Sequence, residues 1–255
     1  GKTACVIGSA EGLGAAFSRE LCRRGFDLLL VDNNQSALEA LAQEIRTNSK
    51  IHVTLLHLDL NDRDAIETLQ AAFIENDVNM LIYNAAYGPV RPFLENSAEQ
   101  LDSYIRVNMA TPLHLVRTFI KINTGRKAGL LLLSSIAGFH GTRLLIPYAA
   151  SKAFCWNLAE GLHYEFRDTE LEISACIAGA TATPNYLATR PANSWLTPTP
   201  MSPDKVARET LNKFGKHLFI VPGMPNKIFH NFLNRILPRS LSSGLHNLAV
   251  KKMYG

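Results

Sequence analysis

The chain has 255 residues, 47% of them hydrophobic and 19% charged, which is enough for one large α/β domain with a full hydrophobic core. It contains no repeat, no low-complexity block and no apolar run approaching the ~20 residues that a membrane-spanning helix needs. We therefore expect one soluble, cytoplasmic domain. The chain opens on Gly1 without an initiator methionine, so a leader or anchor could have been removed.

The net charge of +4 is unevenly placed, because no acidic residue follows Glu209 and the last stretch is basic. No recognised reading motif accompanies these basic residues, so a nucleic-acid partner is not expected. The cysteines show no C-x-x-C spacing and no paired histidine ligands, which indicates a reducing compartment and no metal site. They are Cys5, Cys22, Cys155 and Cys176.

An apolar strand predicted over 3–7 leads directly into a glycine-rich loop and then into a helix that reaches about Arg24. Glycines let the backbone turn tightly and approach a pyrophosphate, and the amino end of a helix offers free N–H groups. The strand before the loop and the helix after it favour dinucleotide binding over a plain turn. The predicted cofactor contacts here are Gly8, Glu11, Gly12, Leu13 and Gly14.

The second strand, predicted over 27–31, ends in Asp32. A carboxylate at this distance from the glycine loop can accept hydrogen bonds from the adenosine ribose hydroxyls, and with Glu11 it would repel a 2′-phosphate. NAD is therefore the predicted cofactor, and NADP is not excluded. Asp32 could instead cap the helix predicted over 36–47. Other residues that could cap that helix equally well are Asn33, Asn34 and Ser36.

Two further strands are predicted over 52–58 and 80–83, and each is followed by polar or small residues. Asp59 can reach the adenine amino group or cap a turn, and both interpretations stay open. Small side chains after the later strand leave room for a cofactor. The candidate cofactor contacts at these two strand ends are Asp59, Leu60, Asn84 and Ala85.

A long helix is predicted over 97–123, with Asn108 in its interior. Asparagine is a mediocre helix former, so its position invites a functional interpretation. A surface asparagine is the simpler alternative.

The residues that best indicate chemistry are Ser135, Tyr148 and Lys152. Four leucines at 130–133 predict a buried parallel strand that ends at Ser135, and a helix is predicted from Tyr148 to about Arg167. Tyr148 and Lys152 are four residues apart, so they lie one turn apart on the same helix face. A nearby ammonium stabilises the phenolate form, which would let Tyr148 exchange a proton with a substrate oxygen, and Ser135 could donate to the same oxygen. A core tyrosine beside a solvated lysine is the alternative.

The last part of the domain contains a strand predicted over 172–176, a helix over 204–213 and a strand over 217–221. The segment from about 183 to 203 is predicted to be irregular, since it carries several prolines and an isolated Trp195. Such a segment is typical of a lid that supplies substrate specificity.

Alternating strands and helices predict an α/β fold, a Rossmann-type doubly wound parallel sheet over 1–222, followed by a helical tail over 223–255. From about Thr3 to Val221 the chain resembles the short-chain dehydrogenase/reductases. The resemblance rests on residues that occur in order at family spacing. They are Gly8, Gly12, Gly14, Asp32, Asp59, Asn84, Ala85, Asn108, Ser135, Tyr148, Lys152, Gly179 and Thr183.

The resemblance implies a catalytic tetrad in which Tyr148 is the general acid/base and Ser135 steadies the substrate oxygen. It further implies that Lys152 tunes Tyr148 and holds the nicotinamide ribose, while Asn108 anchors a water in a proton relay. Ser135 is preferred over Ser134 on spacing alone. The other implied contacts are Asp59 to the adenine, Asn84 beside the cofactor, and the main chain near Ile177 and Thr181 with Thr183 at the carboxamide.

The sequence departs from the family pattern at Ile7, Tyr83, Ala86 and Ala178. Each departure lies at a supporting position outside the tetrad, so we expect weaker cofactor affinity before any loss of chemistry.

The tail carries apolar residues at helical spacing, with basic residues on other faces. It could pack over the substrate cleft, dock on a second subunit or lie on an anionic membrane surface. Its apolar residues are Ile228, Phe229, Phe232, Leu233, Ile236 and Leu237.

Together these features predict an NAD(H)-dependent oxidoreductase that interconverts a hydrophobic secondary alcohol and its ketone. The alternative is a dinucleotide-binding regulatory or scaffold protein with impaired catalysis. Family habit predicts a homo-oligomer, and membrane association through the tail stays open.

Overall fold

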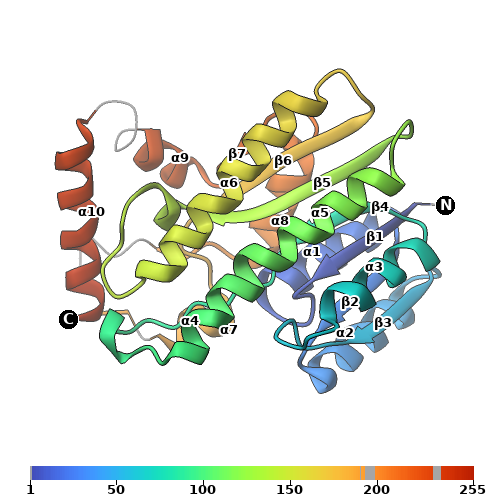
Figure 1. Ribbon diagram of the computed structural model, residues 1–255, viewed down its shortest axis with the longest axis horizontal. Helices are drawn as coiled ribbons and strands as arrows, with labels where there is room; N and C mark the ends of the chain where they lie inside the picture. The colour runs from blue at the N-terminus through green and yellow to red at the C-terminus, as the bar shows by residue number, and fades with distance from the viewer. Residues whose placement is uncertain (1, 190, 193–198, 232–236) are drawn as a thin grey trace.

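A parallel β-sheet organises the structure (Figure 1). The computed structural model describes residues 2–189, 191–192, 199–231 and 237–255. The strands are β1 (Thr3–Ile7), β2 (Asp27–Asp32), β3 (Val53–His57), β4 (Val78–Tyr83), β5 (Ala128–Ser135), β6 (Leu171–Ala178) and β7 (Phe219–Ile220). They pair in parallel in the order β3-β2-β1-β4-β5-β6-β7. The order reverses direction between β1 and β4, where open sheets of this type bind ligands.

Helical segments connect the strands and cover both faces of the sheet (Figure 1). The doubly wound α/β fold predicted from the sequence is confirmed. The α-helices are α1 (Gly12–Arg23), α2 (Gln35–Asn48), α3 (Ala65–Glu75), α4 (Ala98–Ile105), α5 (Thr111–Ile122), α6 (Ile146–Phe166), α7 (Pro184–Ala188), α8 (Pro203–Lys213), α9 (Met224–Asn231) and α10 (Arg239–Tyr254). Shorter or wider turns form η1 (Phe93–Glu95), η2 (Arg106–Ala110) and η3 (Ile136–Phe139).

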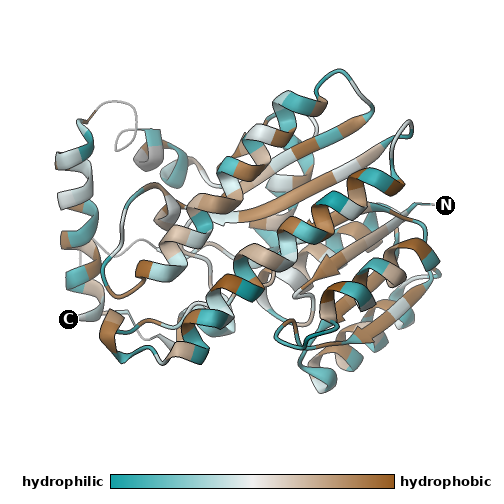
Figure 2. Cartoon of the chain, in the orientation of Figure 1, coloured by the Kyte–Doolittle hydropathy of each residue, from teal (hydrophilic) through white to brown (hydrophobic). Residues whose placement is uncertain are grey.

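Two hydrophobic cores lie on the two faces of the sheet because successive strand residues point in opposite directions. Leu28 and Leu30 pack with α1, α2 and α8, whereas Leu29 and Val31 pack with α3, α5 and α6. Strands buried on both sides need largely apolar sequence, and Figure 2 shows β5 brown over most of its length. The sheet is therefore a rigid platform, and its carboxyl ends face the end of the molecule where α10 lies (Figure 1).

The helix predicted over 97–123 is interrupted, which corrects the sequence interpretation. The chain passes from α4 into the wider π-turn η2 and then into α5. Asn108 lies in η2, so the poor helix former of the sequence marks an irregular turn.

The segment predicted to be irregular from 183 to 203 contains the short helix α7, which Thr183 caps by accepting from the Tyr186 N–H. Trp195 lies outside the described residues, as do Phe232, Leu233 and Ile236 of the predicted tail stripe. Most of the described part of the tail is helical, in α9 and α10. Among the described residues no helix has the length and hydrophobicity to cross a bilayer.

Candidate active site

The glycine loop joins β1 to α1 with two residues in the left-handed region, Gly8 at φ 77° and Gly12 at φ 55°. A Cβ on Gly8 would lie 2.7 Å from the Ala85 backbone, and one on Gly14 would lie 1.8 Å from the Gly8 carbonyl oxygen. Only glycine fits these positions. The N-cap residue of α1, Glu11, makes no side-chain capping hydrogen bond, so the first N–H groups of this helix remain available to a ligand.

Asp32 holds the glycine loop in place from the end of β2. Its carboxylate accepts from the Ala10 N–H at 2.8 Å and from the Asn34 N–H at 3.0 Å. The alternative role as N-cap of α2 is wrong, because Asn34 caps that helix by accepting from the Ala37 N–H. On the other side Asn84 donates to the Gly8 carbonyl oxygen at 2.7 Å. Both predicted cofactor residues therefore also shape the loop.

Asp59 follows β3 and accepts from both the main chain and the side chain of Asn61, at 2.9 and 3.1 Å. Asp59 therefore caps this turn, as one of the two sequence interpretations predicted. Its carboxylate also lines the cleft together with the mostly buried Leu60, so the adenine contact remains a prediction.

The two serines at the end of β5 have different surroundings. Ser134 also borders the cleft, but it is buried and its hydroxyl proton is already donated to the Lys152 carbonyl oxygen at 2.7 Å. Ser135 lines the cleft and accepts from the Ala137 N–H at 3.2 Å, which leaves its own hydroxyl proton free for a ligand. The geometry therefore favours Ser135 as the donor to a substrate oxygen.

Tyr148 and Lys152 lie in the same cleft on the first turns of α6. The Lys152 Nζ is 5.6 Å from the centroid of the Tyr148 ring and donates to the Leu133 carbonyl oxygen at 2.8 Å. Lys152 is only 5% exposed, so its charge acts in a partly dehydrated environment. The Tyr148 ring is packed against Gly88, where a Cβ would lie 2.6 Å from the ring.

Asn108 is buried outside the cleft and acts as a positioning residue. Its amide group accepts from the Tyr87 N–H at 2.7 Å and donates to the Tyr87 carbonyl oxygen at 2.8 Å. It also donates to Ser151 Oγ on α6 at 2.9 Å. Asn108 therefore ties the turn after β4 to the helix that carries Tyr148 and Lys152. The Tyr83 hydroxyl supports the same region by donating to the Val107 carbonyl oxygen in η2.

One cleft of about 1240 Å³ collects most of the predicted residues at the carboxyl ends of the strands. Three predicted residues do not line it: Gly14, which supports Gly8, the buried Asn108, and Ile177, which is fully buried in β6. The predicted residues that do line it are Gly8, Glu11, Gly12, Leu13, Asp32, Asp59, Leu60, Asn84, Ala85, Ser135, Tyr148, Lys152, Thr181 and Thr183.

The tail closes one side of this cleft. Packing over the cleft was one of the three positions that the sequence allowed for the tail. On α10, His246 shares a hydrogen bond with Thr142 Oγ1 at 3.1 Å, and the Tyr254 hydroxyl lies 3.3 Å from Thr189 Oγ1 at the end of α7. Burial, with a smaller effect of His140, lowers the pKa of His246 to about 4. The imidazole is therefore neutral at pH 7 where it lies between α10 and Thr142. The apolar stripe predicted for the tail covers 228–237 and includes neither residue, so no sequence pattern pointed to His246 or Tyr254.

These residues fit a dinucleotide: a glycine turn without room for side chains, an uncapped helix start, a carboxylate after β2, and a hydroxyl, phenol and amine at the far end of the cleft. The fold and the site therefore define a nucleotide-dependent oxidoreductase of the Rossmann type. Sequence comparison agrees, since residues 2–194 match the family model for short chain dehydrogenase. The chain belongs to the short-chain dehydrogenase family, and the predicted family and enzyme class are confirmed.

Individual relatives include steroid enzymes. The chain is 28% identical over 228 residues to a 7beta-hydroxysteroid dehydrogenase of Clostridium sardiniense, covering 89% of this chain and 87% of that protein. A solved 7beta-hydroxysteroid dehydrogenase superposes with a TM-score of 0.87 at 23% identity, with 96% of each chain covered. The human inactive hydroxysteroid dehydrogenase-like protein 1 is 28% identical over 212 residues, covering 78% of this chain and 62% of that protein.

Proposed function

We propose that this protein is an NAD(H)-dependent oxidoreductase that interconverts a hydrophobic secondary alcohol and its ketone. The observation that carries the proposal is that Ser135, Tyr148 and Lys152 line the same cleft as the glycine loop. The hydroxysteroid relatives support a bulky apolar substrate. The apolar residues around the substrate end of the cleft, including Val90, Leu145 and Met253, support it as well.

The proposed mechanism uses Tyr148, Ser135 and Lys152 around the substrate oxygen. A bound nicotinamide supplies the hydride acceptor or donor. In the oxidative direction Tyr148 removes the hydroxyl proton of the substrate, and in reduction it returns that proton to the ketone oxygen. Ser135 donates a hydrogen bond to the same oxygen as charge develops on it. Lys152 stabilises the phenolate of Tyr148 by its charge and has N–H groups to spare for the nicotinamide ribose.

Asn108 is proposed to act through position. Its hydrogen bonds to Tyr87 and Ser151 fix the separation between the turn after β4 and α6. The water-anchoring role implied by the family remains a proposal. Both amide N–H groups of Asn108 donate to protein groups and its Oδ1 accepts one hydrogen bond, so a water would be held by the remaining acceptor capacity of Asn108.

The catalytic proposal is tested by the Tyr148→Phe variant. We expect a fall in kcat of about 10³-fold with unchanged thermal stability, since only the proton-transferring oxygen is removed. Tyr164→Phe is the matched control, because Tyr164 lies on the same helix α6 and is 61% exposed. Normal turnover of a secondary alcohol by Tyr148→Phe would refute the assignment.

The cofactor preference is proposed to come from Asp32, whose carboxylate would repel a 2′-phosphate. Glu11 contributes further negative charge on the same side of the cleft. Asp32→Asn keeps an acceptor for the Ala10 N–H but removes the charge. We expect it to lower the ratio of kcat/KM for NADH over NADPH by about tenfold. An unchanged ratio would show that Asp32 does not set the preference.

The second candidate is a dinucleotide-binding protein that has lost catalysis, and the inactive human relative is the observation in its favour. The two candidates differ in one measurement. A protein that binds NADH in a calorimetric titration but oxidises none of a panel of hydroxysteroids and aliphatic secondary alcohols would support the non-catalytic role.

A peripheral contact with anionic membranes is proposed for the outer face of α10. Leu241, Leu245 and Leu248 lie on this face with exposed fractions of 53%, 44% and 47%, and Lys251 follows one turn later. Co-sedimentation with phosphatidylglycerol vesicles should be lost in the triple Leu→Ser variant and kept in Ile74→Ser, whose residue is 65% exposed on α3. Equal vesicle binding by both variants would remove the membrane role. The predicted homo-oligomer is tested separately, by light scattering of the purified protein without vesicles.

A further inference from the structure

The segment 140–143, which lies between Ser135 and Tyr148 in the chain, is hydrogen-bonded along its whole length to α10. The distances are 2.8 to 3.1 Å. The pairs are His140 with Ser243, Thr142 with His246, and both Gly141 and Arg143 with Asn247. His140 and Thr142 are only 4% and 1% exposed, so water competes little with this contact. The tail is thus attached to the same loop that leads from one predicted catalytic residue to the next.

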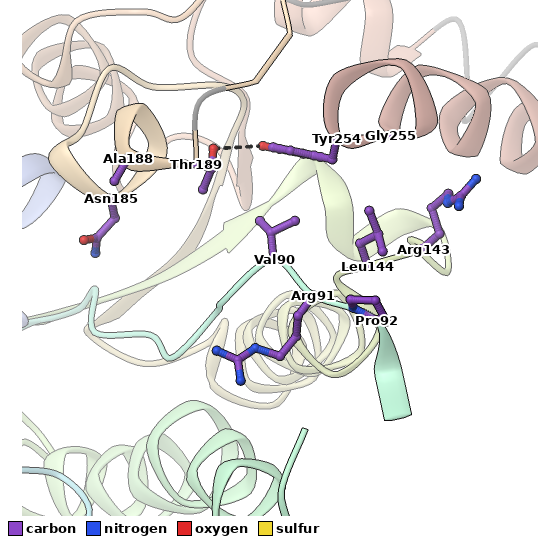
Figure 3. Close-up of a pocket in the computed structure, with 10 residues that line it drawn as sticks. All are labelled: Val90, Arg91, Pro92, Arg143, Leu144, Asn185, Ala188, Thr189, Tyr254 and Gly255. Carbon is purple, nitrogen blue, oxygen red and sulfur yellow. Dashed lines mark hydrogen bonds between the residues drawn. The ribbon is translucent and has the colours of Figure 1, made fainter. Parts of the chain in front are cut away.

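The carboxyl end of α10 is anchored separately. The Tyr254 hydroxyl lies 3.3 Å from Thr189 Oγ1 at the end of α7, a contact that Figure 3 shows as a dashed line. Between the two anchors, Ala249, Val250 and Met253 line the cleft. Because several contacts at both ends hold α10, the removal of one side chain leaves the helix docked.

One of these contacts continues from α10 to Ser135. The Thr142 hydroxyl lies 3.0 Å from the His140 carbonyl oxygen and 3.2 Å from the Ala137 carbonyl oxygen. Carbonyl oxygens only accept, so the single hydroxyl proton of Thr142 is used there, and its oxygen accepts from the Nε2–H of His246. The N–H of Ala137 in turn donates to Ser135 Oγ at 3.2 Å. A continuous series of hydrogen bonds therefore joins His246 to Ser135.

Every group in this series donates towards Ser135. Each hydrogen bond polarises the next one when the donors are aligned in this way, most of all where water is excluded. The Ser135 oxygen accepts from Ala137, so its own proton is directed to another acceptor, which the cleft can supply. Burial keeps His246 neutral at pH 7 by lowering its pKa to about 4, and the contact with Thr142 places its one ring proton on Nε2.

We propose that His246 is a positioning residue for Ser135, which it orients through Thr142 and Ala137 when α10 is docked. The tail helix is then part of the catalytic unit as well as a wall of the cleft. The inference rests on the proposed function, because that function gives Ser135 its role as donor to the substrate oxygen. It adds a residue that touches neither the substrate oxygen nor the nicotinamide and acts on the rate through the serine hydroxyl.

The test asks whether His246 acts through Ser135. His246→Leu removes the donor to Thr142 and should lower kcat about tenfold, with an unchanged Kd for NADH. His246→Gln keeps an N–H donor and should retain most of the rate. In the Ser135→Ala background, His246→Leu should lower kcat no further, because the hydroxyl that it positions is gone. Asn247→Ala is the matched control: it loosens the same contact outside the series, so its effect on kcat should be the same in both backgrounds.

An equal fold loss on His246→Leu in both backgrounds would overturn the inference, and so would an unchanged kcat in His246→Leu alone. In either case a slow Ser135→Ala enzyme would leave the proposed reaction standing. If Ser135→Ala keeps the wild-type rate, the role of Ser135 fails and this inference fails with it. If the wild-type protein turns over no secondary alcohol or ketone, calorimetric titration of its NADH complex with an oxosteroid decides. Weaker ketone binding in His246→Leu that disappears in the Ser135→Ala background would support the positioning role, and any other result would refute it.

Discussion

The contact between Gly88 and Tyr148 gives the sharpest prediction about catalysis. A Cβ at position 88 would lie 2.6 Å from Tyr148 Cδ2, 3.0 Å from Cε2 and 3.4 Å from Cγ. Carbon atoms in ordinary contact are about 3.5 to 4.0 Å apart, so the Gly88→Ala variant must move the ring by about 1 Å. A displacement of this size at a reacting group lowers the rate by roughly 10²-fold. We therefore expect kcat to fall about 100-fold.

The stability of the Gly88→Ala variant should change little, because Gly88 is exposed and has no left-handed φ to lose. The assay is the initial rate of secondary alcohol oxidation with saturating NAD, read by NADH absorbance, together with the melting temperature. Gly161→Ala is the matched control on α6, since its Cβ would meet no atom within 4 Å. That control should keep its rate and gain about 0.5 to 1 kcal/mol of stability. Equal rates in Gly88→Ala and wild type would show that the ring position does not limit turnover.

Two other predictions separate neighbouring roles. Ser135→Ala should lower kcat by about 10²-fold to 10³-fold at unchanged stability. Ser134→Ala should lower the free energy of unfolding by about 1 kcal/mol, because it loses the hydrogen bond to the Lys152 carbonyl oxygen. Steady-state rates and urea unfolding measure the two effects, and the reverse pattern would make Ser134 the hydrogen-bond donor to the substrate. His246 has a folded-state pKa of about 4 against an ordinary value of 6.5, so its contribution to stability is complete above pH ~6.5 and is lost as the pH falls towards 4. At pH 5 the wild-type protein should have lost about 2 kcal/mol of its free energy of unfolding through His246, and the His246→Gln variant should not show this loss. Parallel pH profiles of the free energy of unfolding for the two proteins would contradict the prediction.

The fold was predictable because its determinants are local in the sequence. Four consecutive leucines at 130–133 form the middle of β5, and the glycine loop lies between β1 and α1 as expected. Propensity did not predict the π-turn at Asn108, since the turn depends on contacts with Tyr87 and Ser151 that are distant in sequence. Local patterns thus predicted the strands and helices, and long-range hydrogen bonds decided where a helix is interrupted.

The sequence predicted which residues belong to the candidate site better than it predicted what each side chain does there. Asp32 and Asn84 were expected to meet a cofactor, and the structure shows that both also hydrogen-bond to the glycine loop. Asn108 was expected in the reacting group, yet it lies outside the cleft and positions α6. Spacing along the chain identifies which residues belong together, but it cannot say which of them face the cleft.

Gly88 shows why part of the site stays invisible to sequence reasoning. In the sequence it belongs to a run of small residues, which predicts room for a cofactor. In the structure the space beside Gly88 is taken by the ring of Tyr148, sixty residues later in the chain. A glycine required for close approach looks the same in sequence as one required for a turn, and only the identity of the neighbour distinguishes them. Substitutions at Gly88 should therefore change the rate of proton transfer before they change cofactor affinity, whereas substitutions at Asn84 should act first on the glycine loop.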